Sequence, residues 1–330
     1  MQNNKIVLAD IFEAQRRISS VVRRIPLRKS IDLSKRIGTN IYYKLEFLQD
    51  TCSFKVRGAA NFIVHLSPDE RKRGVVTYST GNHGIATAYV ARLLGSKAKV
   101  CLSNNVTNNK QEEIKKVGGE LIIYGKSQDE AEIRALELRD KEGLFVVPPF
   151  DNPYIIAGQG TIGLEILEDL PKVDLVLVPV SGGGLISGIA IAIKNANPKC
   201  KVIGVSMSGG AAMYESLKQD KPTQVEEVQT LADSLQGGIL LNNKYTFDIV
   251  KEYVDDMIIV TEEEIALGIA YAFLKDHYVI EGAAAVGIVA LLTGKVKDVG
   301  QNVVVLTTGS NIDNGQFLSV IKENKDKFDN

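Results

Sequence analysis

The sequence predicts an α/β protein whose parallel sheets form two units. Short runs rich in β-branched residues alternate with longer amphipathic stretches along most of the 330 residues, and this alternation is typical of helices that connect parallel strands. At about 150 residues per domain, the length fits one large or two medium domains. Hydrophobic residues make up 45% of the chain and charged residues 24%, close to the average of globular proteins.

The first half of the chain is expected to begin with a helix and to continue into one compact unit. Asp10 is expected to cap a helix over 11–22, where apolar residues recur at three- and four-residue spacings. Between about Val75 and Val147, four strands alternate with three helices through short connections. The first six of these elements are expected at VVTYS, HGIATAYVARLLG, KAKVCLS, NNKQEEIKKVGG, ELIIYG and SQDEAEIRALELRDKEG.

A proline-rich segment over 148–153 interrupts this unit and predicts a crossing between domains, because a proline restricts the residue before it. A second series follows, namely TIGLEILEDL, VDLVLVPV, LISGIAIAIKNA, KVIGVSM, helices near 262–274 and 282–292, and NVVVLTT. In such folds ligands bind in clefts at the carboxyl ends of the strands. We therefore expect the functional site in a cleft between the two units.

Charge and cysteine content argue against several classes of function. The 39 basic and 40 acidic residues give a net charge of −1 without a basic block, which disfavours nucleic acid or an anionic membrane as a partner. No apolar run reaches the length of a membrane span, and 1–5 does not begin a signal peptide. Three distant cysteines and three histidines favour neither a disulfide scaffold nor a zinc site. We therefore expect a cytoplasmic protein.

A glycine loop follows the apolar strand VDLVLVPV and comes directly before a helix. It comprises Ser181, Gly182, Gly183, Gly184 and Leu185. Glycines let the backbone approach a ligand, and the helix N-terminus adds partial positive charge, so the loop could hold a phosphate. A tight turn without a ligand is the alternative. The loop is no dinucleotide fingerprint, because Ser187 stands where G-x-G-x-x-G needs its last glycine.

Lys55 is a candidate nucleophile. It lies between Phe54 and Val56, and partial desolvation there would lower its pKa and make the amine reactive toward carbonyl groups. The alternative is an ordinary solvated lysine. Arg57, two residues further on, is expected to be structural.

Two further polar loops follow strands. Ser79, Thr80, Gly81, Asn82 and His83 begin a helix and could hold a carboxylate, although an N-cap with an incidental histidine is the alternative. Thr308 follows the strand over 303–307, where an ordinary turn is the alternative. An amine, a phosphate loop, a carboxylate loop and a hydroxyl together suit pyridoxal phosphate and an amino-acid substrate.

The whole chain resembles the fold-type II pyridoxal-phosphate enzymes of the threonine/serine dehydratase and serine racemase family, which have the tryptophan synthase β-like fold. The resemblance extends over RIPL, KLEFLQDTCSFKVRGA, STGNHG, PFDNPYIIAGQGTIGLEI, PVSGGGLISG, VIEGAAAVG and LTTGSNID, in that order. It implies two three-layer α/β domains, a large cofactor-binding domain over 1–48 and 151–330 and a small one over 49–150.

The resemblance also implies roles for the residues that match the family's motifs. Lys55 would bond covalently to the cofactor and act as the catalytic base, with Phe54 packed on the ring. Asn82 would contact the ring hydroxyl, Thr308 the ring nitrogen, and Glu281 would lie near the ring. The phosphate would be held by Ser181, Gly182, Gly183, Gly184 and Leu185, and the substrate carboxylate by Ser79, Thr80, Gly81, Asn82 and His83.

The implied activity is β-elimination of a β-hydroxy amino acid, L-threonine or L-serine, to a 2-oxo acid and ammonia. A hydroxyectoine-utilisation dehydratase is an alternative, because the run over 230–238 and STGNHG are similar to that branch. Serine racemase is another, although Thr80 replaces the serine that supplies a proton on the opposite face. A binding protein without turnover and a Rossmann-type oxidoreductase are alternatives of other kinds.

The resemblance has consequences for metals and assembly. The stretch over 205–212 lacks the carboxylates with which some relatives bind a divalent cation, so no metal is expected. The chain stops soon after LTTGSNID, so no C-terminal regulatory domain is expected. A homodimer is expected from the family.

Overall fold

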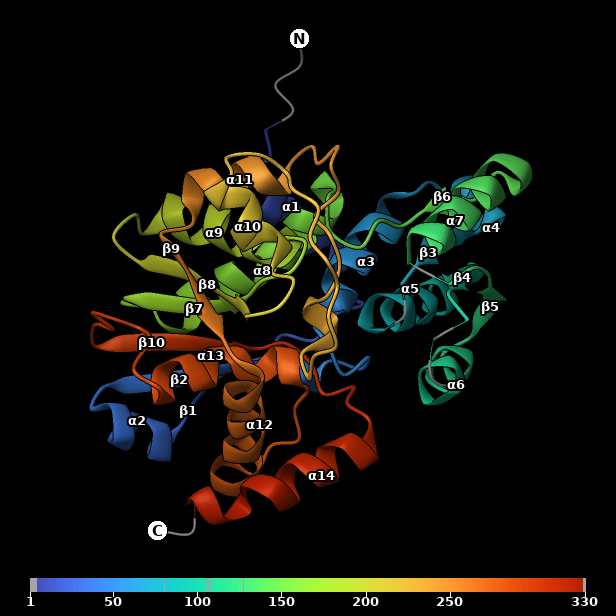
Figure 1. Cartoon of the computed structure of the whole chain (residues 1–330). Helices are drawn as coiled ribbons and strands as arrows, with labels where there is room; N and C mark the ends of the chain where they lie inside the picture. The colour runs from blue at the N-terminus through green and yellow to red at the C-terminus, as the bar shows by residue number, and fades with distance from the viewer. Residues whose placement is uncertain (1–4, 80, 105, 107, 127, 329–330) are drawn as a thin grey trace.

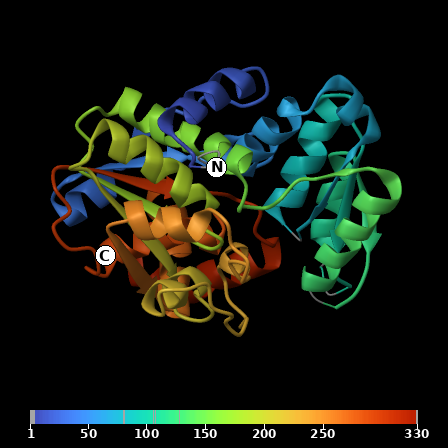
Figure 2. The same ribbon diagram turned by 90° about the horizontal axis from the view of Figure 1, so that it is seen from above.

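The computed structural model describes residues 5–328 except 80, 105, 107 and 127, and it contains two sheets in two lobes (Figures 1 and 2). The larger sheet has six strands in the order β1-β2-β10-β7-β8-β9, parallel except for the antiparallel pair β1–β2. Its strands are β1 Leu27–Lys29, β2 Asn40–Leu45, β7 Leu175–Pro179, β8 Lys201–Met207, β9 Asp256–Val260 and β10 Asn302–Thr307.

The helices of the larger lobe cover both faces of its sheet. They are α1 Leu8–Ile18, α2 Ile31–Ile37, α8 Pro153–Asp169, α9 Gly184–Ala196, α10 Ala212–Lys218, α11 Thr246–Tyr253, α12 Glu262–Asp276, α13 Gly282–Leu292 and α14 Asn314–Asn324. Three short 3₁₀ turns, η1 Glu46–Leu48, η2 Asp233–Leu235 and η3 Lys325–Phe328, complete the lobe.

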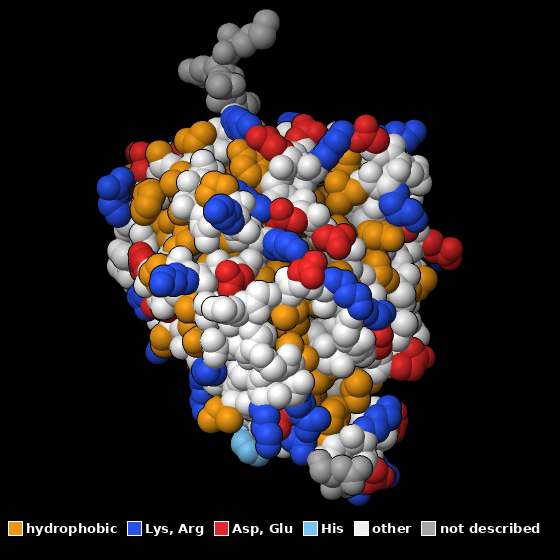
Figure 3. All heavy atoms as spheres, turned by 90° about the vertical axis from the view of Figure 1, so that its left-hand side faces the viewer, with side chains coloured by type: hydrophobic (Ala, Val, Ile, Leu, Met, Phe, Trp, Pro, Cys, Tyr) orange, Lys and Arg blue, Asp and Glu red, His pale blue; other side chains and the backbone are white. Residues whose placement is uncertain are grey.

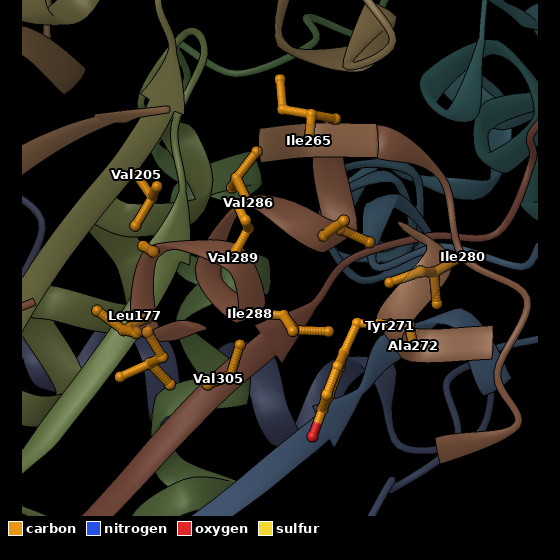
Figure 4. Close-up of a cluster of buried hydrophobic side chains, with 14 of the residues drawn as sticks. Leu177, Val205, Ile265, Tyr271, Ala272, Ile280, Val286, Ile288, Val289 and Val305 are labelled. Carbon is orange, nitrogen blue, oxygen red and sulfur yellow. The ribbon is translucent and has the colours of Figure 1, made fainter. Parts of the chain in front are cut away.

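The alternation of side chains along the buried strands explains the layers. Leu175 and Leu177 of β7 pack with α12 and α13, whereas Val176 and Val178 pack with α8 and α9 on the opposite face. Figure 4 shows Leu177 and Val305 among the side chains of α13. A strand buried on both faces must be apolar throughout, which is why the sequence of β7 is a continuous apolar run.

The smaller lobe has a four-stranded parallel sheet in the order β5-β4-β3-β6. Its strands are β3 Val75–Tyr78, β4 Ala98–Leu102, β5 Gly119–Ile123 and β6 Phe145–Val146, and its helices are α3 Lys55–His65, α4 Pro68–Arg73, α5 Asn82–Leu93, α6 Asn108–Lys116 and α7 Gln128–Glu142. α3 and α5 cover one face and α7 covers the other. The predicted α/β class with three-layer units is confirmed.

The two sheets are separate, but the helices between them do not divide cleanly into two lobes. α3 packs against α5 of the smaller lobe and also against α8 of the larger one. The domain ranges 1–48, 49–150 and 151–330 therefore remain a prediction.

Two helices begin earlier than the sequence suggested. Asp10 is not the N-cap of α1: the helix starts at Leu8, and the Asp10 carboxylate accepts a hydrogen bond from the Val7 N–H at 2.8 Å. The expected domain crossing at 148–153 is partly helical, since Asn152 caps α8 by accepting from the Tyr154 N–H at 2.9 Å and Pro153 occupies the first turn.

The surface carries charges of both signs. On the face in Figure 3, acidic and basic side chains lie interspersed with apolar ones. None of the helices in the described part of the chain is long and apolar enough to cross a membrane.

Candidate active site

A cavity lies where loops from both sheets meet. It is lined by the loop after β3, the glycine loop after β7, the residue after β10 and the start of α3. The predicted site residues that line it are Phe54, Lys55, Ser79, Gly81, Asn82, His83, Ser181, Gly182, Gly183, Gly184, Leu185, Glu281 and Thr308. Thr80, the remaining one, lies outside the described residues. Segments more than 200 residues apart in the sequence thus form one site.

Lys55 is the first residue of α3, and its amine is partly withdrawn from water. Phe54 precedes it, and the Phe54 N–H donates to the Thr308 carbonyl at 3.0 Å, which ties this helix start to the end of β10. Lys55 Nζ donates to the Pro149 carbonyl at 3.0 Å. Burial lowers the pKa of Lys55 from 10.5 to about 8, and the nearby charge of Glu281 limits the fall. A lysine with such a pKa is a reactive amine near neutral pH.

The glycine loop is too closely packed for side chains. A Cβ at Gly182 would lie 2.4 Å from the ring of Phe150, and one at Gly183 would lie 2.6 Å from Met213 Cε. Gly183 also has a φ of +87°, which disfavours any other residue. The loop leads into α9, so its backbone faces the cavity with the positive end of a helix dipole, an arrangement that binds anions.

Asn82 and Glu281 form a buried pair across the cavity. Asn82 Nδ2 lies 2.9 and 3.0 Å from the two carboxylate oxygens of Glu281, and Asn82 Oδ1 accepts from Asn311 Nδ2 at 2.6 Å. Burial raises the pKa of Glu281 to about 7 against the lowering effect of the Asn82 hydrogen bond. Glu281 precedes α13, but its side chain does not cap that helix. The carboxyl group therefore belongs to the cavity.

His83 is buried and neutral. Its Nε2 lies 3.0 Å from the Val147 carbonyl oxygen, so Nε2 carries the hydrogen and donates it. Burial, reinforced by the charge of Lys55, lowers the pKa of His83 to about 3. The imidazole brings no positive charge to the cavity.

Thr308 has an unused hydroxyl. Its Oγ1 is buried and has no hydrogen-bond partner within the described part of the chain. A buried polar atom without a partner is costly. This hydroxyl is therefore available to a ligand in the cavity.

The outer wall of the site is not predicted by the sequence. The structure places η2 and the loop that follows it against the cavity, together with Lys110 from α6. Lys110 forms a salt bridge with Asp233 that joins the two lobes at the cavity. The run over 230–238, similar to the hydroxyectoine-utilisation branch, is the one sequence feature noted in this wall, and it carries no information about a partner in α6.

Comparison with known proteins identifies the family. Residues 18–309 match the family described as pyridoxal-phosphate dependent enzyme. The chain is 48% identical over 318 residues to a putative threonine dehydratase of Sinorhizobium fredii, covering 96% of both chains. It is 46% identical to the L-threonine ammonia-lyase of Thermotoga maritima, covering 96% of this chain and 79% of the relative.

Solved structures agree with these relatives. Maize serine racemase matches with a TM-score of 0.90 at 30% identity, covering 97% of this chain and 98% of the other. Threonine deaminase isoform 2 of Solanum lycopersicum matches with a TM-score of 0.87 at 34% identity, covering 97% of this chain and 90% of the other. The resemblance proposed from the motifs, and with it the fold-type II architecture, is confirmed.

Proposed function

Because the chain belongs to the pyridoxal-phosphate dependent enzyme family, we propose that it is an ammonia-lyase acting on a β-hydroxy amino acid, L-threonine or L-serine. The net reaction releases ammonia and leaves a 2-oxo acid. The observation that carries the proposal is the meeting of the Lys55 amine, the glycine loop and the unpaired Thr308 hydroxyl in one cavity. Relatives named threonine dehydratase and ammonia-lyase at 40–48% identity support it.

The residues present fit pyridoxal 5′-phosphate, on which the enzyme depends. Thr308 Oγ1, buried without a partner among the described residues, would contact the ring nitrogen. The glycine loop over 181–185, where a side chain at Gly182 or Gly183 would collide with its surroundings, would hold the phosphate. Lys55 would hold the aldehyde through a covalent bond, and Phe54 would pack on the ring.

The chemistry is divided between the cofactor and the chain. When bound, pyridoxal phosphate stabilises negative charge on the α-carbon of an attached amino acid. Lys55, with a pKa of about 8, is neutral in about a tenth of the molecules at pH 7 and can remove the α-proton. Thr308 carries no charge, so it does not favour protonation of the ring nitrogen as a carboxylate would. A neutral partner at this position would therefore favour loss of the β-hydroxyl from the substrate.

We assign the substrate carboxylate to the loop over 79–83. This loop leads into α5, whose N-terminal N–H groups and helix dipole favour an anion. His83 contributes by packing and not by charge, because its imidazole is neutral. The proposed role of Thr80 remains a prediction, because this residue lies outside the described ones.

The Asn82–Glu281 pair is assigned a place beside the ring. The amide of Asn82 is bonded to Glu281 and would turn part of its hydrogen-bonding capacity toward the ring hydroxyl. Glu281, with a pKa of about 7, can hold or release a proton near neutral pH.

Serine racemisation is a second candidate activity. The similarity of maize serine racemase over nearly the whole chain favours it. It needs a proton donor on the face of the substrate opposite Lys55, the role foreseen for Thr80. Chiral analysis of serine incubated with the enzyme separates this activity from elimination.

Assembly, location and metal use remain predictions. A cytoplasmic homodimer would be checked by sedimentation and cell fractionation. Within the described residues no group of three or more His, Cys, Asp or Glu could hold a metal ion. Turnover that persists after exhaustive chelation would support the predicted independence from divalent cations.

The experiment that tests the function is a panel of β-hydroxy amino acids assayed for 2-oxo acid and ammonia. We expect release of 2-oxobutyrate from L-threonine or pyruvate from L-serine, in equal amount to ammonia. Cofactor binding without release from any amino acid of the panel would show a binding protein instead. Alanine, which lacks the β-hydroxyl, is the matched control substrate.

A further inference from the structure

Behind α3 lies a group of four buried ionisable side chains that the proposed chemistry does not use. The group, which we term the quartet, consists of Lys44, Glu46, Arg57 and Glu165. Two cations face two anions, and each side chain is at most 6% exposed. The residues come from β2, η1, α3 and α8, so the quartet joins the helix that carries Lys55 to the larger lobe.

Arg57 is the centre of the quartet. Its Nε and Nη2 each lie 2.8 Å from an oxygen of Glu46, and its Nη1 and Nη2 lie 2.8 and 2.9 Å from the oxygens of Glu165. Nη1 also donates to Thr161 Oγ1 at 3.1 Å. A guanidinium that binds two carboxylates through its planar fork has a fixed position and orientation.

Lys44 completes the group. Its Nζ lies 2.5 Å from Glu165 Oε2 and also donates to the Ile25 carbonyl. Burial opposes the ionisation of Glu165, but Arg57 and Lys44 outweigh it and keep the pKa of this carboxyl below its ordinary value. Burial likewise opposes the charge of Arg57, and Glu46 and Glu165 raise the pKa of the guanidinium above its ordinary value. Arg57 and Glu165 therefore stabilise the charged form of one another.

Stability alone does not explain such a group. Well-packed apolar side chains often replace buried ion pairs without loss of stability, because desolvation cancels much of the attraction. What charged and hydrogen-bonded groups add is direction, since each contact has a preferred distance and angle. The position of the quartet beside the first turn of α3 indicates that this turn is what the contacts orient.

Arg57 lies in the first turn of α3, two residues after Lys55. No side chain caps this helix start, which is held by the hydrogen bond from the Phe54 N–H to the Thr308 carbonyl and by the contacts of the first turn. At the same place α3 and α8 are in backbone contact: a Cβ at Gly158 would lie 2.6 Å from the Arg57 carbonyl oxygen. The quartet therefore connects the first turn of α3, from which Lys55 projects into the cavity, to α8 through Arg57 and Glu165.

We propose that Arg57, held by Glu46 and Glu165, is a positioning residue that sets the place of the Lys55 amine. The inference rests on the proposed function for the role of Lys55. A displaced helix start would move the amine away from the Pro149 carbonyl and out of its desolvated place. Both the reactivity of the amine and its pKa would then change.

The test compares Arg57→Lys, Glu46→Gln and the control Ile63→Val in the full chain. Arg57→Lys keeps the charge but loses the fork, and Glu46→Gln removes one anion with little change of shape. Ile63 is a buried residue of the same helix outside the quartet, so Ile63→Val reports loss of stability alone. Circular dichroism and melting temperature establish that each variant is folded.

Two measurements report on Lys55. In the loaded enzyme, we expect Arg57→Lys to lower kcat by about tenfold or more while KM stays within about twofold, because misplaced groups lose rate before affinity. In the full chain freed of cofactor, acylation of Lys55 is followed by peptide mass spectrometry against pH. We expect its midpoint to rise by about half a pH unit or more in Arg57→Lys as the amine becomes more solvated. Glu46→Gln is expected to change kcat and the pH midpoint of acylation in the same directions as Arg57→Lys, by smaller amounts.

The second measurement does not depend on turnover, so it stands even when no β-hydroxy amino acid proves to be a substrate. The control Ile63→Val sets the size of a change caused by lost stability alone. The proposal is overturned when Arg57→Lys and Glu46→Gln change the acylation midpoint, and kcat relative to KM, no more than this control does. When Arg57→Lys does not fold, Glu46→Gln decides alone by the same comparison.

Discussion

The molecule contains two clusters of buried ionisable groups that behave in opposite ways. In the quartet, every charge is matched by an opposite charge at hydrogen-bond distance, and Arg57 and Glu165 remain ionised. In the cavity, the side chains of Lys55, His83 and Glu281 have no ion pair among the described residues, and their pKa values move to about 8, 3 and 7. Burial with pairing gives a rigid support, whereas burial without pairing favours the uncharged form of each group and brings the pKa values of Lys55 and Glu281 close to neutral pH.

The largest effect is expected from Lys55→Ala. Without the amine, the chain can neither bond to the cofactor nor remove the α-proton, and turnover should fall by about a thousandfold or more. The visible absorbance of the bound cofactor and the release of 2-oxo acid are the measurements. Lys115→Ala, on the surface of α6, is the control and should keep full activity. Borohydride reduction that attaches the cofactor to a lysine other than Lys55 would contradict the assignment.

A smaller effect is expected when the glycine loop is changed. Gly183→Ala adds a Cβ that meets Met213 and Thr246 in a backbone with a φ of +87°. The loop must shift, so the dissociation constant of pyridoxal phosphate should rise by about a hundredfold. Fluorescence titration of the cofactor measures it. Gly294→Ala is matched in backbone strain, with a φ of +67°, but meets nothing within 4 Å. An equal rise in both variants would indicate general strain and not a phosphate site.

The contribution of the outer wall to substrate binding is tested at the salt bridge between Lys110 and Asp233. Because the pair is partly exposed, we expect Lys110→Met to raise KM by no more than about fivefold. The KM of the unchanged enzyme should rise with salt toward that of the variant, since salt screens the pair. Lys115→Met breaks a pair with Glu112 within α6 and should leave KM unchanged. A KM without salt dependence would show that the bridge does not affect binding.

The smallest effect concerns pH. Only the neutral amine attacks the aldehyde, so cofactor uptake by the chain freed of it should accelerate as pH rises through about 8. The charge of Glu281 raises the pKa of Lys55, so Glu281→Gln should lower this midpoint, by about half a unit or less. Stopped-flow absorbance against pH gives both midpoints. Glu112→Gln, an exposed residue of α6, is the control, and a midpoint that rises in Glu281→Gln would contradict the sign.

The sequence predicted the features that depend on neighbouring residues. The apolar run of β7 and the glycines after it indicated a buried strand and a tight loop before a helix, and the structure shows both. The role of this loop in holding an anion stays a prediction. The neighbours of Lys55 indicated desolvation, which lowers its pKa as expected. Motif resemblance then connected loops that no local pattern joins.

The features that the sequence did not predict depend on contacts between distant residues. Asn82 and Glu281 are 199 residues apart, and Arg57 and Glu165 are 108 apart. No periodicity relates such positions, so Arg57 could only be expected to be structural. The sequence does not predict the early start of α8, because the prolines over 148–153 indicate a crossing between domains, whereas Pro153 is favoured in the first turn of a helix.

The segment at 149–150 contacts two parts of the cavity lining. The Pro149 carbonyl accepts a hydrogen bond from the Lys55 amine, and the Phe150 ring occupies the space that a side chain at Gly182 would need. One short stretch of backbone thus supports both the Lys55 amine and the glycine loop. Any displacement of this stretch disturbs both together, so an enlarged residue at 182 would be tolerated only alongside a smaller one at 150.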